Sequence, residues 1–210
     1  MNAQPSLCKG FTFTHLQMAV TNSQWNLIAS IKLLVTVFGS TKKICRQTRK
    51  NEEVPQKLLF DLFVSVVKYA KYRNIDIQKW ITKRYPRFCI YCGEKVCNCT
   101  LPGIQRPLIP CDVTQIKPDT KLSLRRFQLR DFTVYPNDKS YTAKLIRAMH
   151  LSEEVYELLI EIFKDIIGQS DILKITEEVV DVLERTISFA STFDIDFEAL
   201  VLGMLPTQPP

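Results

Sequence analysis

Apolar residues recur at helical spacing along most of the chain, and strictly alternating β-branched runs are scarce. The pattern predicts two helices, an irregular middle and two more helices, with additional short helices near the N-terminal flank of each pair. Four prolines and two glycines between Cys89 and Asp119 interrupt the helical period. We therefore predict an all-α fold with a small Cys-rich irregular module between two helical units.

The helical pattern that begins at residue 61 is repeated 120 residues later without a gap. Residues 61–86, DLFVSVVKYAKYRNIDIQKWITKRYP, align with residues 181–206, DVLERTISFASTFDIDFEALVLGMLP. Each stretch reads as an amphipathic helix, a break, a short helix and a final proline. Upstream, residues 26–38 align more loosely with residues 150–162. This self-similarity predicts a tandem duplication, with units at 1–88 and 132–210 and the Cys-rich module and linker at 89–131.

Charge is divided unequally between the two halves of this otherwise ordinary globular composition. Residues 1–120 hold 18 Lys and Arg against 7 Asp and Glu, and residues 121–210 hold 10 against 15. The basic half could face nucleic acid, or the two halves could attract each other. No apolar run approaches the roughly 20 residues of a membrane span, and the N-terminus has no secretory signal pattern. We expect a cytoplasmic protein without a membrane partner.

Acidic residues follow the edges of the apolar stripes on the two helices of the second unit. Glu154 and Glu157 share one helix, and Glu178 and Asp181 share the next. A spacing of three residues puts both members of each pair on one face, one turn apart. If the helices pack antiparallel, four carboxylates gather, and a divalent cation such as Mg²⁺ relieves their repulsion. A solvated acidic face is the alternative interpretation.

Glu153-Glu154-x-x-Glu157 followed by Glu178-x-x-Asp181 resembles the EExxE…ExxD signature of MazG-like nucleotide pyrophosphohydrolases. The lead-in from His150 to Ser152 and the turn at Asp194–Asp196 into a short final helix are also similar to that family. In the first unit, the resemblance lies in Asn74-Ile75-Asp76, in Lys83-Arg84-Tyr85-Pro86 and in the cysteines that follow. The resemblance covers roughly residues 26–100 and 140–206.

The resemblance implies an all-α enzyme in which two tandem MazG-like helical bundle units pack as an internal pseudo-dimer. The implied reaction is hydrolysis of a (deoxy)nucleoside triphosphate to the monophosphate and pyrophosphate, of the kind that cleans the nucleotide pool. It also implies Mg²⁺, which Mn²⁺ could replace, and catalytic metal ligands at Glu154, Glu157, Glu178 and Asp181, with Glu153 in support. The base, the sugar, the general base and the substrate-binding residues stay open. The fused chain could pair again as a homo-oligomer.

The first unit departs from this acidic pattern. In the alignment, Ala29, Ser30 and Leu33 face the first acidic motif, Leu58 faces Glu178, and only Asp61 remains. One carboxylate cannot replace four, so we predict a degenerate first copy without a metal site of its own. Its basic residues, such as Lys32 or Lys57, could lie near the phosphates of a substrate in the second unit.

Four cysteines lie within eleven residues, spaced Cys89-x2-Cys92-x4-Cys97-x-Cys99. Four thiolates suit a closed tetrahedral zinc site. The second pair is closer than in a usual zinc ribbon, so reduced thiols or a redox pair stay open as alternatives. Three isolated cysteines are predicted to pack in the core: Cys8, Cys45 and Cys111.

A non-catalytic protein is the main alternative function. The basic first half and the Cys cluster could form a module that binds nucleic acid or another protein. Its basic residues form one run at 42–50 and a second at 83–88, where aromatics are interleaved with them. A pseudoenzyme, in which both copies have lost turnover, is a third hypothesis.

Overall fold

The computed structural model describes residues 10–20, 27–99, 116–136 and 139–205. Within these ranges every regular element is a helix, and an isolated β-bridge pairs Thr12 with Ser123. The prediction of an all-α fold is confirmed. The helices are α1 (Phe13–Ala19), α2 (Leu27–Arg49), α3 (Gln56–Tyr72), α4 (Ile77–Arg84), α5 (Leu124–Val134), α6 (Tyr141–Ile166), α7 (Ile172–Ser191) and α8 (Phe197–Met204).

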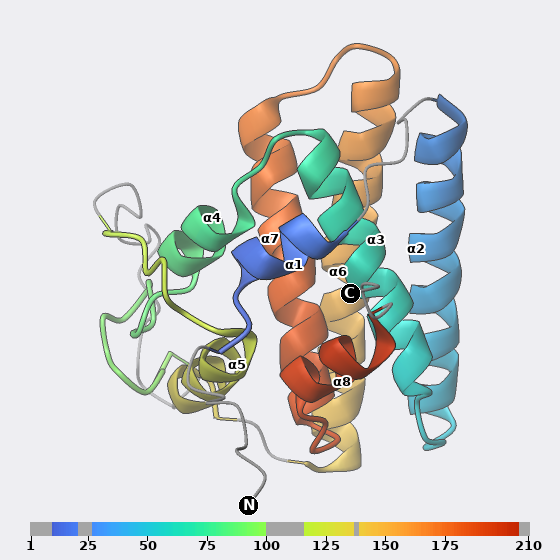
Figure 1. Cartoon of the computed structure of the whole chain (residues 1–210). Helices are drawn as coiled ribbons and strands as arrows, with labels where there is room; N and C mark the ends of the chain where they lie inside the picture. Colours follow the sequence, from blue (N-terminus) through green and yellow to red (C-terminus); the bar gives the residue numbers. More distant parts are fainter. Residues whose placement is uncertain (1–9, 21–26, 100–115, 137–138, 206–210) are drawn as a thin grey trace, which may run out of the picture.

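The four long helices α2, α3, α6 and α7 stand side by side as a bundle (Figure 1). Helix α2 contacts α3 and α6, and α7 contacts the same two helices from the opposite corner. Cys45 Sγ lies 2.8 Å from Ser152 Oγ, and the Arg49 carbonyl accepts a 2.7 Å hydrogen bond from the Tyr141 hydroxyl. These contacts make α2 and α6 antiparallel. Short connections also make α2–α3 and α6–α7 antiparallel, so neighbouring helices of the bundle all run antiparallel. Helices α3 and α6 run in the same direction and are joined by the long connection that contains α4 and α5 (Figure 1).

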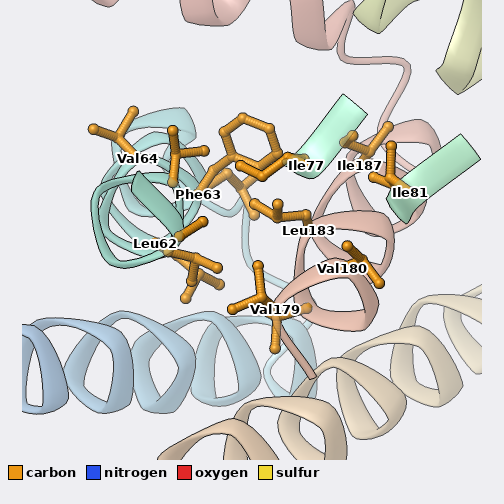
Figure 2. Packing of buried hydrophobic residues seen from close by; sticks show 14 of the residues in the cluster. Leu62, Phe63, Val64, Ile77, Ile81, Val179, Val180, Leu183 and Ile187 are labelled. Carbon is orange, nitrogen blue, oxygen red and sulfur yellow. The ribbon is translucent and has the colours of Figure 1, made fainter. Parts of the chain in front are cut away.

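Side chains from both halves of the chain meet in one hydrophobic core. Figure 2 shows Leu62 and Phe63 of α3 close to Leu183 of α7, with Ile77 and Ile81 of α4 beside them. All five are fully buried and belong to a single cluster. The two halves therefore bury their apolar faces against each other.

The breaks predicted at Asn74–Asp76 and Asp194–Asp196 have the same backbone geometry. Asn74 and Asp194 both adopt left-handed backbone angles, with φ of 55° and 57°. Asn and Asp tolerate this region better than most residues because their short side chains bond locally. The turns are closed by equivalent hydrogen bonds, from Ile75 N–H to the Ala70 carbonyl (2.8 Å) and from Ile195 N–H to the Ala190 carbonyl (3.2 Å). The helices that follow are capped in the same way. Asp76 accepts from Lys79 N–H (2.9 Å), and Asp196 accepts from Ala199 N–H (3.1 Å).

The turns that follow α2 and α6 also match. The offset in residue number between them differs from the one used in the loose upstream alignment. Asn51 and Gly168 both adopt positive φ after these helices, and equivalent hydrogen bonds close the turns from Glu52 to Gln47 and from Gln169 to Lys164. These positions are 117 residues apart, not 124. A shift of seven residues nearly preserves a helical stripe, so the apolar pattern alone does not separate the two alignments. The corrected alignment places Thr36, Val37 and Ser40 opposite the acidic motif, again without a carboxylate.

Most of helix α5 lies in the segment that the sequence predicts as module and linker (89–131), and its last turn crosses into the predicted second unit. Its buried residues Leu124, Phe127 and Val134 keep helical spacing, but Arg125, Arg126 and Arg130 mask that period in the sequence. Among the helices described, none combines the length and apolarity needed to cross a membrane.

Candidate active site

A cavity of about 670 Å³ lies between the α6–α7 pair and the cysteine module, which we define as residues 89–99. Its lining combines charged residues with cysteine, aromatic and apolar residues. All five acidic residues predicted for the site line the cavity. The charged and titratable residues there are Glu153, Glu154, Glu157, Glu178, Asp181, Arg84, Arg147, Arg185 and His150.

Three of the predicted carboxylates come together on the wall of this cavity. One carboxylate oxygen from each of Glu154, Glu157 and Glu178 lies within 4.8 Å of the others, so the three could hold a metal ion. Antiparallel packing of α6 on α7 makes the two acidic edges face each other. Glu178 Oε2 is buried, and it has no hydrogen-bond partner in the described part of the chain.

The carboxylates repel one another in this arrangement. Burial, together with the charges of Asp181, Glu157 and Glu154, raises the pKa of Glu178 to about 8. Burial and the Asp181 charge also raise the pKa of Glu154. A cation between the carboxylates would offset their repulsion and stabilise their charged forms, so the electrostatics fit a metal site.

Asp181 lies on the same wall but is held by residues of the first half. The Arg84 guanidinium donates from Nε (3.1 Å) and Nη2 (2.9 Å) to its two oxygens, and the Tyr85 hydroxyl donates a third bond at 2.6 Å. Although burial works to lower it, the Asp181 carboxylate raises the pKa of Arg84 overall, so the guanidinium stays charged. The sequence gives no signal for this contact, since the partners are 97 residues apart.

Arg185 holds a second carboxylate of the site. Its Nε lies 3.3 Å from Glu154 Oε1, and its Nη1 lies 3.1 Å from the fully buried Glu184. Burial and the positive charges of Arg185 and Arg147 lower the pKa of His150, which therefore stays neutral near pH 7. Three arginines thus border three carboxylates, an arrangement that suits an anion bound through a cation.

Beneath the cavity, Asp131 of α5 faces Glu184 of α7. Both side chains are buried, and within the described ranges neither carboxyl group accepts a well-formed hydrogen bond. Burial raises the pKa of both groups. A proton shared by the pair adds to the ion pair of Glu184 with Arg185 and removes the repulsion between two buried carboxylates.

This pair predicts a measurable pH dependence of stability. The folded state retains a proton that the unfolded state releases above about pH 4.5, so stability falls with rising pH above that value. One proton corresponds to a slope of about 1.4 kcal/mol per pH unit. We expect Asp131→Asn to reduce this slope between pH 5 and 7 in urea unfolding. An unchanged slope would show that the pair does not hold the proton.

The four thiols of the cysteine module converge on one point. Their sulfur atoms lie within 4.8 Å of one another, so they could hold a metal ion such as zinc. Gly93, with φ of 74°, donates to the Cys89 carbonyl at 2.8 Å and closes the turn between the first two thiols. Burial works to raise the pKa of Cys89, but backbone N–H groups of Cys92 and Tyr91 outweigh it and lower that pKa to about 7.

The remaining predicted residues lie away from the cavity or outside the described ranges. Lys57 pairs with Asp61 on the surface of α3 at 2.6 Å, and neither they nor Lys32 line the cavity. Half-buried Cys45 packs against α6. Cys8 and Cys111 lie outside the described residues.

Searches of protein-family models, of curated proteins and of solved structures find no match to this chain.

Proposed function

We propose that this protein hydrolyses a nucleoside triphosphate to the monophosphate and pyrophosphate, with Mg²⁺ as the metal and Mn²⁺ as a substitute. The observation that carries the proposal is the meeting of Glu154, Glu157 and Glu178 on the wall of a cavity that three arginines also line. The unpartnered Glu178 oxygen and the raised carboxyl pKa values fit such a cation.

The residues divide the work of the reaction. Mg²⁺ prefers oxygen ligands, keeps waters and shares its shell with phosphates, and it makes a bound water a better nucleophile. Glu154, Glu157 and Glu178 would hold it, and a carboxylate at the cavity wall would accept the proton of the attacking water. Asp181 would complete the ligand set by exchanging Arg84 for the cation, with Glu153 in support.

The arginines would bind the phosphates. Arg84 pairs with Asp181 and Arg185 pairs with Glu154. The cation would bind both carboxylates and free the two guanidinium groups. Guanidinium groups bind phosphate oxygens in a bidentate way, and a buried one does so with little loss of flexibility. Arg84 belongs to the first half, so the catalytically degenerate half would supply a positive group to the substrate.

A tandem duplication accounts for the architecture. The matched breaks after α3 and α7, the matched caps of α4 and α8 and the matched turns after α2 and α6 support it. Under this proposal the chain is an internal pseudo-dimer of two MazG-like units, with one acidic site where a symmetric dimer would have two. The pairing of Asp61 with Lys57 fits a first unit that has lost its site.

The testing experiment measures pyrophosphate release from a panel of ribo- and deoxyribonucleoside triphosphates, with Mg²⁺ or with EDTA. We expect equimolar monophosphate and pyrophosphate from at least one nucleotide, and no turnover with EDTA. Release of inorganic phosphate instead would point to a different reaction. No turnover, together with salt-sensitive binding to RNA or DNA, would favour the nucleic-acid-binding alternative.

A further inference from the structure

The sulfur atoms of the cysteine module have the spacing of a metal site. Cys89 Sγ lies 3.7 Å from Cys99 Sγ. Zinc–sulfur bonds of about 2.3 Å at tetrahedral angles place neighbouring sulfurs about 3.8 Å apart, whereas a disulfide requires about 2.05 Å. The separation therefore fits a shared ion and not a bonded pair.

The module is also a wall of the cavity. Cys89, Cys97 and Cys99 line it together with their neighbours Ile90 and Tyr91. The Cys97 N–H donates to the Val134 carbonyl at 2.6 Å, so α5 holds the second half of the module. Arg130 of α5 donates to the Tyr85 carbonyl at 2.7 Å and so holds the chain just before the module.

The lining of the cavity combines two kinds of chemistry. Besides the carboxylates and arginines, it includes the apolar and aromatic residues Ile90, Tyr91, Tyr135, Pro136 and Ile146. A ligand that fits both kinds of lining has a polyphosphate at one end and a flat, largely apolar group at the other. A nucleoside triphosphate has that form, and aromatic rings bind bases by stacking.

We propose that the cysteine module holds one zinc ion through its four thiolates, and that the zinc-bound turn presents Ile90 and Tyr91 to the nucleobase. Zinc replaces the proton of each thiol and fixes the turn. The base-binding part rests on the proposed function, whereas the zinc part stands without it. The module thus contributes to nucleotide recognition as well as to stability.

Elemental analysis of the purified protein tests the zinc ion. We expect one zinc per chain, and we expect Cys92→Ser to lose the zinc and to lower the melting temperature. Protein without zinc, or thiols found oxidised to a disulfide, would overturn the assignment. The zinc count of the unaltered protein decides this even if Cys92→Ser does not fold.

Two probes test the base-binding wall: a non-hydrolysable nucleoside triphosphate analogue and inorganic tripolyphosphate, each titrated with Mg²⁺. Loss of one stacking ring weakens binding about tenfold, so Tyr91→Ala should bind the analogue about tenfold more weakly and tripolyphosphate unchanged. Tyr156→Ala removes an exposed tyrosine of α6 outside the cavity and should change neither affinity.

The outcomes separate this inference from the proposed function. If Tyr91→Ala binds both probes as the unaltered protein does, Tyr91 does not contact the base. The proposal of a base-binding wall is then wrong, while the phosphate site is unaffected. If the unaltered protein binds neither probe, the proposed function fails and the base-binding wall fails with it.

Discussion

Glu157→Gln is expected to abolish Mg²⁺-dependent pyrophosphate release while leaving helical content unchanged. Glu157 is exposed on α6, and its carboxylate meets those of Glu154 and Glu178. A metal ion supplies several kcal/mol of transition-state stabilisation, so loss of a ligand should lower kcat/KM by about a thousandfold. Steady-state pyrophosphate release measures the rate, and far-ultraviolet circular dichroism measures the helicity.

The proposed repeat provides a matched control at Asp181 and Asp61, which the sequence alignment places at equivalent positions in the two halves. Asp181→Asn changes a buried carboxylate of the cavity, and Asp61→Asn makes the same change on the outer surface of α3. We expect a large loss of activity for the first and a change of less than about twofold for the second, since surface substitutions are nearly neutral. Retained activity in Glu157→Gln, or equal losses at the two aspartates, would contradict the site.

Local patterns predicted the helices well because each helix buries one stripe, and a stripe is visible in the sequence as a period. The two acidic edges could be found for the same reason, since Glu154 and Glu157 are neighbours on α6 whatever α6 packs against. A short helix was predicted ahead of the second pair, but the position of α5 was not, because its arginines interrupt the apolar period.

Contacts between distant segments left no such signal. Arg84 and Tyr85 reach Asp181 only because α4 packs on α7. The sequence suggested Lys32 and Lys57 as the basic groups of the first half, but Arg84 is the one that lines the cavity. Spacing also identified the four thiols as a group. It did not indicate that they share a cavity with the acidic residues, because this depends on how α5 and α6 pack in the tertiary structure.

Arg84→Gln is expected to destabilise the metal-free protein and to strengthen its response to Mg²⁺. The substitution removes the guanidinium that neutralises the buried Asp181 and leaves it with the Tyr85 hydroxyl. Breaking a fully buried pair costs about 3–5 kcal/mol. Because about a third of the Arg84 side chain is exposed, we expect a loss of about 2 kcal/mol in the free energy of unfolding.

If cation and guanidinium compete for Asp181, Mg²⁺ should raise the melting temperature of Arg84→Gln more than that of the unaltered protein, because a bound ligand stabilises the state that binds it. Arg73→Gln is the matched control, since it breaks an arginine pair with Asp165 that also joins the two halves but lies outside the cavity. It should destabilise the protein equally with and without Mg²⁺. An equal Mg²⁺ response in all three proteins would show that Asp181 stays with Tyr85 and takes no part in holding the cation.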